Sequence, residues 1–191
     1  ADFVADALPL DWDLHAPDWR GYGLSQWSGA DCYWFPDYIA DLDQLLDHIQ
    51  PEAPVLVVGH SLGGNVAALY AGIRPHRVAK LVNLEGFGLP DSPPDAAPER
   101  MARWLDELKE PATLKPYTDL DAVATRLRKT NPLLRPERAA WLAPHWSRQR
   151  ADGQWEILGD PAHKLANPVL YQKDEVLECW KLITAPLLWV E

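Results

Sequence analysis

A serine between two glycines is the first feature of this sequence that could do covalent chemistry. Residues 59–63 read Gly-His-Ser-Leu-Gly, a G-x-S-x-G pattern, between the apolar run Val55–Val58 and a run of small residues that begins at Gly64. A nucleophile on such a sharp strand-to-helix turn is held in a strained backbone conformation, and side chains beside it would collide with the turn. The pattern therefore predicts Ser61 as a nucleophile at the carboxyl edge of a sheet.

The same turn predicts a place for negative charge. The helix after the serine would point its N-terminus at Ser61, so the backbone N–H of Leu62 is expected to donate to an oxyanion. His60, the variable residue of the pattern, is expected beside the nucleophile, where it would contact substrate rather than act as the base. The alternative is a glycine turn that binds a phosphate at a helix N-terminus.

The elements that must position this turn can be read from hydrophobic patterning. Apolar residues recur at helical spacing over Pro36–Ile49, and strands are expected at Trp12–Pro17, Val55–Val58 and Val78–Leu84. The continuous apolar run Val55–Val58 is typical of a strand buried on both faces. An apolar run returns at Leu187–Val190. Alternation of strand and helix at these spacings predicts an α/β fold with a mostly parallel sheet and crossover helices.

The sequence changes character after Gly88 and has no convincing β-run before residue 184. Helices are expected there at Pro98–Leu108, Leu120–Lys129 and Pro136–Leu142. Residues 1–88 are therefore predicted to form part of the α/β core, residues 89–183 an inserted helical cap or lid, and residues 184–191 a returning core strand.

Composition argues against several classes of partner. The 191 residues carry a formal net charge of -10, and 47% are hydrophobic. This acidic balance disfavours binding to nucleic acid or to an anionic membrane, and the apolar runs are too short to span a bilayer. The two cysteines, Cys32 and Cys179, lack metal-ligand spacing and predict free thiols in a reducing, cytoplasmic compartment, with one disulfide as the alternative.

Several of these features together resemble the α/β-hydrolase fold superfamily. They are the G-x-S-x-G turn, a D-x-R-G-x-G-x-S loop at residues 18–25, the L-E-G-F-G stretch at residues 84–88, and a helical insertion before the strand that begins at Ala185. The R-L-R-K-T-N-P stretch at residues 126–132 is similar to capped serine hydrolases and serine-hydrolase-like proteins. A serine at position 61 disfavours the branches of the superfamily that use an aspartate nucleophile.

The resemblance implies hydrolysis of a carboxylic ester or a related acyl compound through an acyl-enzyme on Ser61. It implies a small-molecule acyl substrate and neither a metal nor an organic cofactor. It also implies that Trp104, Trp141 and Trp146 roof the site and contact substrate, although they could instead form the core of the cap. The rival hypothesis is a non-catalytic α/β-hydrolase-like domain that binds a small apolar ligand or a partner protein.

The order of catalytic groups in the superfamily is serine, acid, histidine. The resemblance implies that the acid is either Glu85 or a residue beyond Glu191, and that the catalytic histidine also lies beyond Glu191. Glu85 could alternatively terminate its strand and hydrogen-bond the following loop. The chain is thus expected to be the central part of a larger hydrolase, cut at both ends, with little turnover from residues 1–191 alone.

Overall fold

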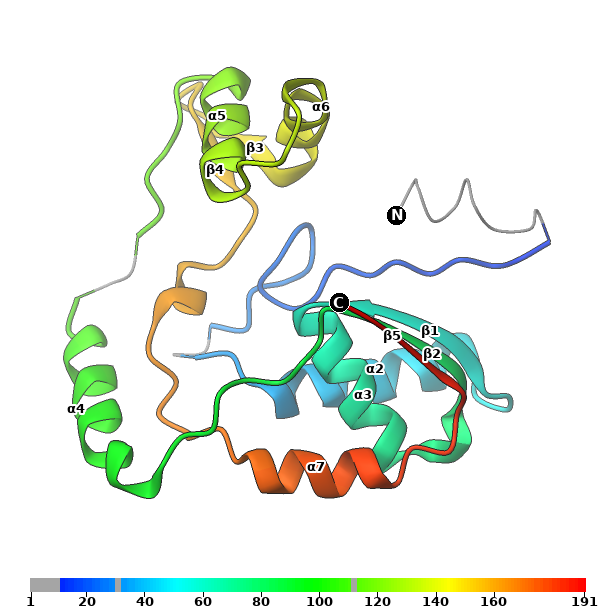
Figure 1. Ribbon diagram of the computed structural model, residues 1–191. Helices are drawn as coiled ribbons and strands as arrows, with labels where there is room; N and C mark the ends of the chain where they lie inside the picture. The colour runs from blue at the N-terminus through cyan, green and yellow to red at the C-terminus, as the bar shows by residue number, and fades with distance from the viewer. Residues whose placement is uncertain (1–10, 30–31, 111–112) are drawn as a thin grey trace. The chain divides into compact units, whose positions relative to one another are not determined.

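A computed structural model describes residues 11–29, 32–110 and 113–191, which divide into two compact units (Figure 1). The first, here called the sheet unit, comprises Gly29–Thr113 and Pro161–Glu191. The second, here called the hairpin unit, comprises Ala1–Ser28 and Leu114–Asp160. The predicted division at residues 88 and 183 remains a prediction, and the first ten residues of its core segment lie outside the described ones.

Three parallel strands form the sheet of the sheet unit, in the order β1–β2–β5. The strands are β1 (Val55–His60), β2 (Val78–Leu84) and β5 (Leu187–Val190). Helix α3 (Leu62–Ile73) connects β1 to β2. The predicted parallel sheet with crossover helices is therefore confirmed.

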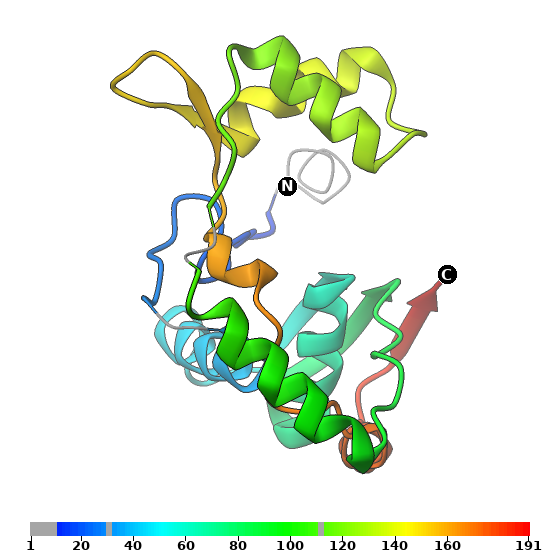
Figure 2. The same ribbon diagram turned by 90° about the vertical axis from the view of Figure 1, so that its left-hand side faces the viewer.

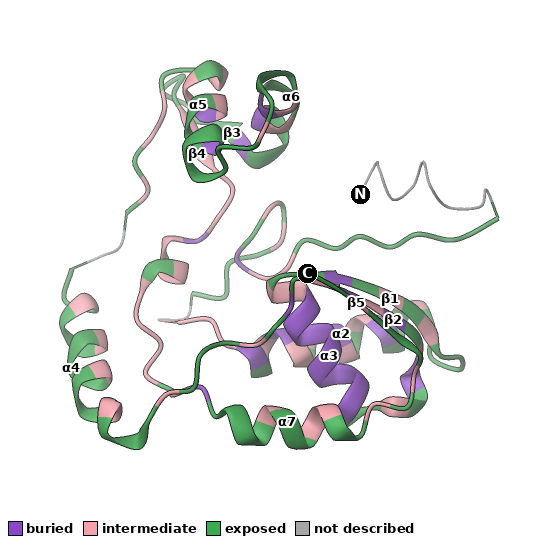
Figure 3. Ribbon diagram, viewed as in Figure 1, coloured by how far each residue is buried: buried purple, intermediate pink, exposed green. Residues whose placement is uncertain are grey.

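Helix α3 is the centre of the core. Its residues from Gly64 to Gly72 are all buried, and Figure 3 shows most of α3 in the colour of buried residues. Small residues allow neighbours to approach closely: a Cβ on Gly72 would lie 1.9 Å from the carbonyl oxygen of Cys179. Cys179 belongs to α7 (Lys173–Lys181), a helix that the sequence did not predict.

Helices α2 (Phe35–Ile49), α3 and α7 lie on the same side of the sheet (Figures 1 and 2). On the opposite face, Leu56, Val58 and Leu188 are 48%, 55% and 58% exposed. The expectation that the strand at residues 55–58 is buried on both faces is thus wrong for the described residues. Side chains alternate between the faces of a strand, and within the described part of the chain helices pack on only one face of β1.

The hairpin unit has a small core of its own. It contains α5 (Leu120–Thr130), α6 (Pro136–Trp146) and an antiparallel hairpin of β3 (Ser147–Gln149) and β4 (Trp155–Ile157). Val123, Leu127 and Ala143 are its buried centre. Helices were predicted at both positions, but the hairpin was missed because strands of three residues are too short to show an alternating pattern.

Two other predictions concern shorter segments. Residues 12–17 form no strand, so the expectation of a strand at Trp12–Pro17 is wrong. The helix expected at Pro98–Leu108 is present as α4 (Ala97–Glu107), in the sheet unit. Short 3₁₀ helices occur at η1 (Pro75–Arg77), η2 (Pro94–Ala96) and η3 (Pro161–Lys164).

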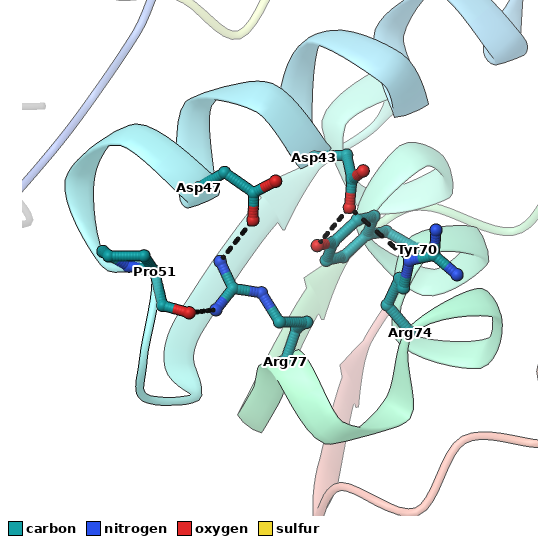
Figure 4. A network of polar contacts seen from close by, with 6 residues as sticks. All are labelled: Asp43, Asp47, Pro51, Tyr70, Arg74 and Arg77. Carbon is teal, nitrogen blue, oxygen red and sulfur yellow. Dashed lines mark hydrogen bonds and ion pairs between the residues drawn. The ribbon is translucent and has the colours of Figure 1, made fainter.

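A polar network joins α2 to the end of α3 (Figure 4). The phenol of Tyr70, a residue only 1% exposed, donates to Asp43 Oδ1 at 2.9 Å. Arg77 donates to the carbonyl oxygen of Pro51 at 2.9 Å and to Asp47 Oδ1 at 3.2 Å. Burial of the phenol, and next its bond to Asp43, raise the pKa of Tyr70 above its ordinary value.

We expect Tyr70→Phe to lower the free energy of unfolding by about 1 kcal/mol at neutral pH, because Asp43 loses a hydrogen bond. Unfolding at high pH releases a phenol proton that the folded protein retains. The wild type should therefore lose stability as the pH rises past the ordinary tyrosine pKa of about 10, and the variant should lose less. Urea unfolding across this pH range measures the difference, and equal pH slopes in both proteins would contradict the prediction.

Candidate active site

Ser61 lies on the turn between β1 and α3, as the glycine pattern predicts. Its backbone has φ 51° and ψ −114°, a left-handed conformation that is strained for a residue with a side chain. The Ser61 N–H donates to the carbonyl oxygen of Leu84 at 2.8 Å, and its own carbonyl accepts from the N–H of Asn65 at 3.0 Å. The turn is therefore held from β2 on one side and from α3 on the other.

Close backbone contacts explain why position 59 is a glycine. A Cβ there would lie 2.4 Å from the carbonyl oxygen of Gly63 and 2.8 Å from Gly64 Cα. Real Cβ atoms do not approach backbone so closely, so any larger residue would force the strand away from the first turn of α3. This contact is the physical reason for the first glycine of the pattern.

The environment of Ser61 suits a reacting group. Ser61 is exposed, and Leu62 is the first residue of α3. The first N–H groups of a helix lack partners within the helix and carry the positive end of its dipole. The Leu62 N–H, adjacent to the serine, is thus in the part of the helix where negative charge is favoured.

Two further predicted site residues lie together at the ends of adjacent strands. His60 Nε2 is 3.3 Å from Glu85 Oε2, with both side chains exposed. Glu85 has a left-handed backbone with φ 57°, and its N–H donates to the carbonyl oxygen of Val190 at 2.9 Å. The carboxylate of Glu85 is therefore placed beside the residue that precedes Ser61, and its backbone extends the pairing of β2 with β5.

Two buried asparagines were missed by the sequence analysis. Asn83, 0% exposed on β2, hydrogen-bonds to the backbone of Gly64 and Gly86. Asn65 on α3 accepts from the N–H of Gly88 at 2.7 Å through Oδ1. A single amide inside the apolar run of residues 78–84 is the signal that could have identified Asn83, since a buried polar side chain requires partners.

An aromatic residue of the loop after β2, Phe87, packs on aromatic side chains of β5 and α7. The ring of Phe87 stacks on Trp189 with centroids 6.3 Å apart, and Trp180 meets Trp189 edge-on at 5.0 Å. Phe87 is 51% exposed. It comes two residues after Glu85, on the loop that follows β2.

The three tryptophans predicted to contact substrate fall in both units. Trp104 lies on α4 in the sheet unit, and its Nε1 is buried with no hydrogen-bond partner in the described part of the chain. Trp141 and Trp146 belong to the hairpin unit, whereas Ser61 belongs to the sheet unit. Contact of these side chains with a substrate on Ser61 therefore remains a prediction.

A cavity of about 240 Å³ also occurs in the sheet unit. It is lined by Trp34, Leu89, Pro90, Asp91, Ser92, Arg100 and Tyr171. Burial raises the pKa of the Tyr171 phenol. The loop after β2 thus runs from Glu85 to the wall of this cavity.

The described residues show neither a metal cluster nor a helix that could span a membrane. Within residues 11–29, 32–110 and 113–191, no group of three or more His, Cys, Asp or Glu side chains could hold a metal ion. In the same ranges, no helix has both the length and the apolar character needed to cross a bilayer. Cys32 and Cys179 are not joined by a disulfide in this structure.

Comparison with known proteins gives consistent matches. A family model described as the alpha/beta hydrolase fold matches residues 2–190. Over 189 residues, 95% of this chain and 57% of the relative, the sequence is 28% identical to a serine hydrolase-like protein of Danio rerio. Over 73 residues, 38% of this chain and 26% of the relative, it is 46% identical to lipase LipV of Mycobacterium tuberculosis.

Solved structures agree with the sequence matches. The thioesterase domain from the curacin biosynthetic pathway has a TM-score of 0.72 and 25% identity, covering 91% of this chain and 62% of that chain. The present chain therefore spans less than two thirds of the length of each of these three proteins, 57%, 26% and 62% respectively.

We expect Gly59→Ala to lower the free energy of unfolding by about 1–3 kcal/mol, because the added methyl group meets the Gly63 carbonyl. Val58→Ala is the matched control: it changes the preceding residue of β1, whose side chain is 55% exposed, and should cost less than about 1 kcal/mol. Urea unfolding compares the two variants. Equal losses would show that the approach of Gly59 to Gly63 is not a constraint on the turn.

Proposed function

The chain belongs to the α/β-hydrolase fold family, and on that premise we propose that it carries the nucleophile of a serine hydrolase that cleaves a carboxylic ester or a related acyl compound. The observation that carries this proposal is the strained backbone of Ser61, with φ 51°, at the start of α3. Strain at a single exposed serine between a strand and a helix serves to present its hydroxyl.

The proposed reaction proceeds by acyl transfer to Ser61. The Oγ atom attacks the carbonyl carbon of the substrate while a general base removes the hydroxyl proton, and the carbonyl oxygen becomes an oxyanion. The N–H of Leu62 donates to that oxyanion. Collapse of the tetrahedral intermediate expels the alcohol, which takes up the proton, and water then hydrolyses the acyl-enzyme by the same steps.

Glu85 is our candidate for the acid that orients the base. In the family order the acid follows the nucleophile and the histidine base follows the acid. Glu85 stands at the carboxyl end of the strand next to that of Ser61, and its carboxylate is 61% exposed and available to a second partner besides His60. With its left-handed backbone at φ 57°, Glu85 is a second strained residue at the same edge of the sheet as Ser61.

The substrate class is proposed from the site and from the names of the relatives. A lipase and a thioesterase both act on acyl compounds, which agrees with a small-molecule acyl substrate. Exposed Phe87 provides apolar surface on the loop that follows β2, and we propose that Trp104, Trp141 and Trp146 contribute further contacts. The chemistry requires neither a metal nor an organic cofactor, and we further propose a cytoplasmic location.

The decisive experiment concerns Ser61. In the protein at its natural length, Ser61→Ala should abolish attachment of a fluorophosphonate probe and lower hydrolysis of a p-nitrophenyl acyl ester by at least about 10³-fold, because the nucleophile is lost. Ser92→Ala, at another serine of the same unit, is the control and should be labelled like the wild type. A wild-type protein that neither reacts with the probe nor turns over the ester would contradict the proposal and favour a non-catalytic binding domain.

A second experiment separates the two roles of Glu85. Glu85→Gln removes the carboxylate and should lower kcat by about 10²-fold to 10⁴-fold if it orients the base. His60→Gln removes the partner of the ion pair and a predicted substrate contact, so it should act mainly on KM and change kcat by less than about 10-fold, since exposed ion pairs contribute little. Small and equal effects of both substitutions would mean that Glu85 is not the acid. Steady-state kinetics on the same ester measures both.

A further inference from the structure

The side chain of Asn83 lies between the first turn of α3 and the loop after β2. Its Nδ2 donates to the carbonyl oxygen of Gly64 at 3.3 Å and to that of Gly86 at 3.1 Å. Its Oδ1 accepts from the N–H of Gly86 at 2.9 Å. Both N–H bonds of the amide are thus used, and one side chain connects the helix that follows Ser61 to the turn that follows Glu85.

The backbone closes tightly around this amide. A Cβ on Gly64 would lie 2.4 Å from Asn83 Oδ1, and a Cβ on Gly86 would lie at the same 2.4 Å from that atom. The Cβ on Gly86 would also come within 2.6 Å of the Gly64 carbonyl carbon. The Asn83 amide therefore fits between α3 and the loop only because positions 64 and 86 are both glycine.

Two neighbouring hydrogen bonds also connect the turn at Ser61 and the start of α3 to the end of β2 and the loop after it. The N–H of Ser61 donates to Leu84, the residue next to Asn83, at 2.8 Å. Asn65 accepts from the N–H of Gly88, at the other end of the loop, at 2.7 Å. The ion pair of His60 and Glu85 is exposed and contributes little by comparison.

We propose that Asn83 is a positioning residue: its amide sets the distance between the first turn of α3, which carries the Leu62 N–H, and the turn that carries Glu85. This inference rests on the proposed function, because it assigns Asn83 an effect on the reaction at Ser61. Without the amide, the carbonyl of Gly64 and both polar backbone groups of Gly86 lose a buried partner. The two turns then shift to find other partners, and misplacement by about 1 Å is enough to slow a reaction.

The first test compares Asn83→Ala with Leu81→Ala in the protein at its natural length. Leu81 is 1% exposed on the same strand, so its truncation also destabilises the core, but its aliphatic side chain can form no hydrogen bond to either turn. Asn83→Ala should lower kcat for the reporter ester and the rate of Ser61 labelling by about 10-fold to 100-fold, with KM changed by less than about 2-fold. Leu81→Ala should lower the thermal midpoint at least as much while leaving kcat nearly unchanged.

A double substitution provides an internal check. In Gly64→Ala, the added methyl group meets Asn83 Oδ1 from the side of α3 and pushes the amide away. This variant should therefore also lower kcat. In the Asn83→Ala background that clash is absent, and the closest remaining neighbour is Gly86 Cα, 3.1 Å from the added Cβ. The combined loss should therefore be smaller than the product of the single losses. If Asn83→Ala does not fold, Asn83→Ser, which retains a hydroxyl, replaces it in both experiments.

Hydrogen exchange makes the inference testable apart from the chemistry. In the Asn83 variant, amides at residues 61–66 and 84–88 should exchange faster than in the wild type, while those of α2 should not. If the wild type proves to have no hydrolase activity but the Asn83 variant still exchanges faster, the structural role of Asn83 is retained and only the proposed function is rejected. Unchanged exchange in these two segments, additive effects of Asn83→Ala and Gly64→Ala, or an equal loss of kcat in Leu81→Ala would each overturn the inference.

Discussion

The candidate site depends on how closely backbone segments approach one another at the carboxyl ends of β1 and β2. Ser61 adopts a left-handed conformation, and the chain can hold it there because its N–H donates to Leu84 at 2.8 Å. That bond requires α3 to begin directly at the sheet edge. A side chain on Gly59 would prevent this approach. Strain at a serine persists only when the surroundings over-determine the conformation, and here they do so through backbone contacts.

The remainder of the sheet unit keeps α3 in place. Buried small residues allow β1, β2 and α7 to pack against the helix, with α7 so close at Gly72 that a methyl group would collide with it. Near the C-terminal end of α3, Tyr70 of this helix and Arg77 of the following η1 bind carboxylates of α2. Packing and polar contacts thus fix both ends of the helix whose N-terminus faces the proposed oxyanion.

Charge has a smaller part in this arrangement than hydrogen bonding to the backbone. The pair of His60 and Glu85 is exposed to solvent, which screens it, so it does not account for the left-handed conformation of Glu85. The buried amide of Asn83, bonded to Gly86, and the pairing of Glu85 N–H with Val190 do account for it. The same buried amide explains why Gly64 and Gly86 both lack a side chain.

Much of the fold and the location of the site could be predicted from the sequence, because they depend on local patterns. Apolar runs at residues 55–58 and 78–84 predicted β1 and β2, the glycine pattern predicted the turn at Ser61, and the family match agrees with the resemblance. Local patterns also misled: Trp12–Pro17 is not a strand, and one face of β1 is exposed. Only the tertiary structure decided that Asn83 bonds Gly64, 19 residues away, and that α7 packs on Gly72. Such contacts join residues far apart in the chain, and no periodicity of neighbouring residues encodes them.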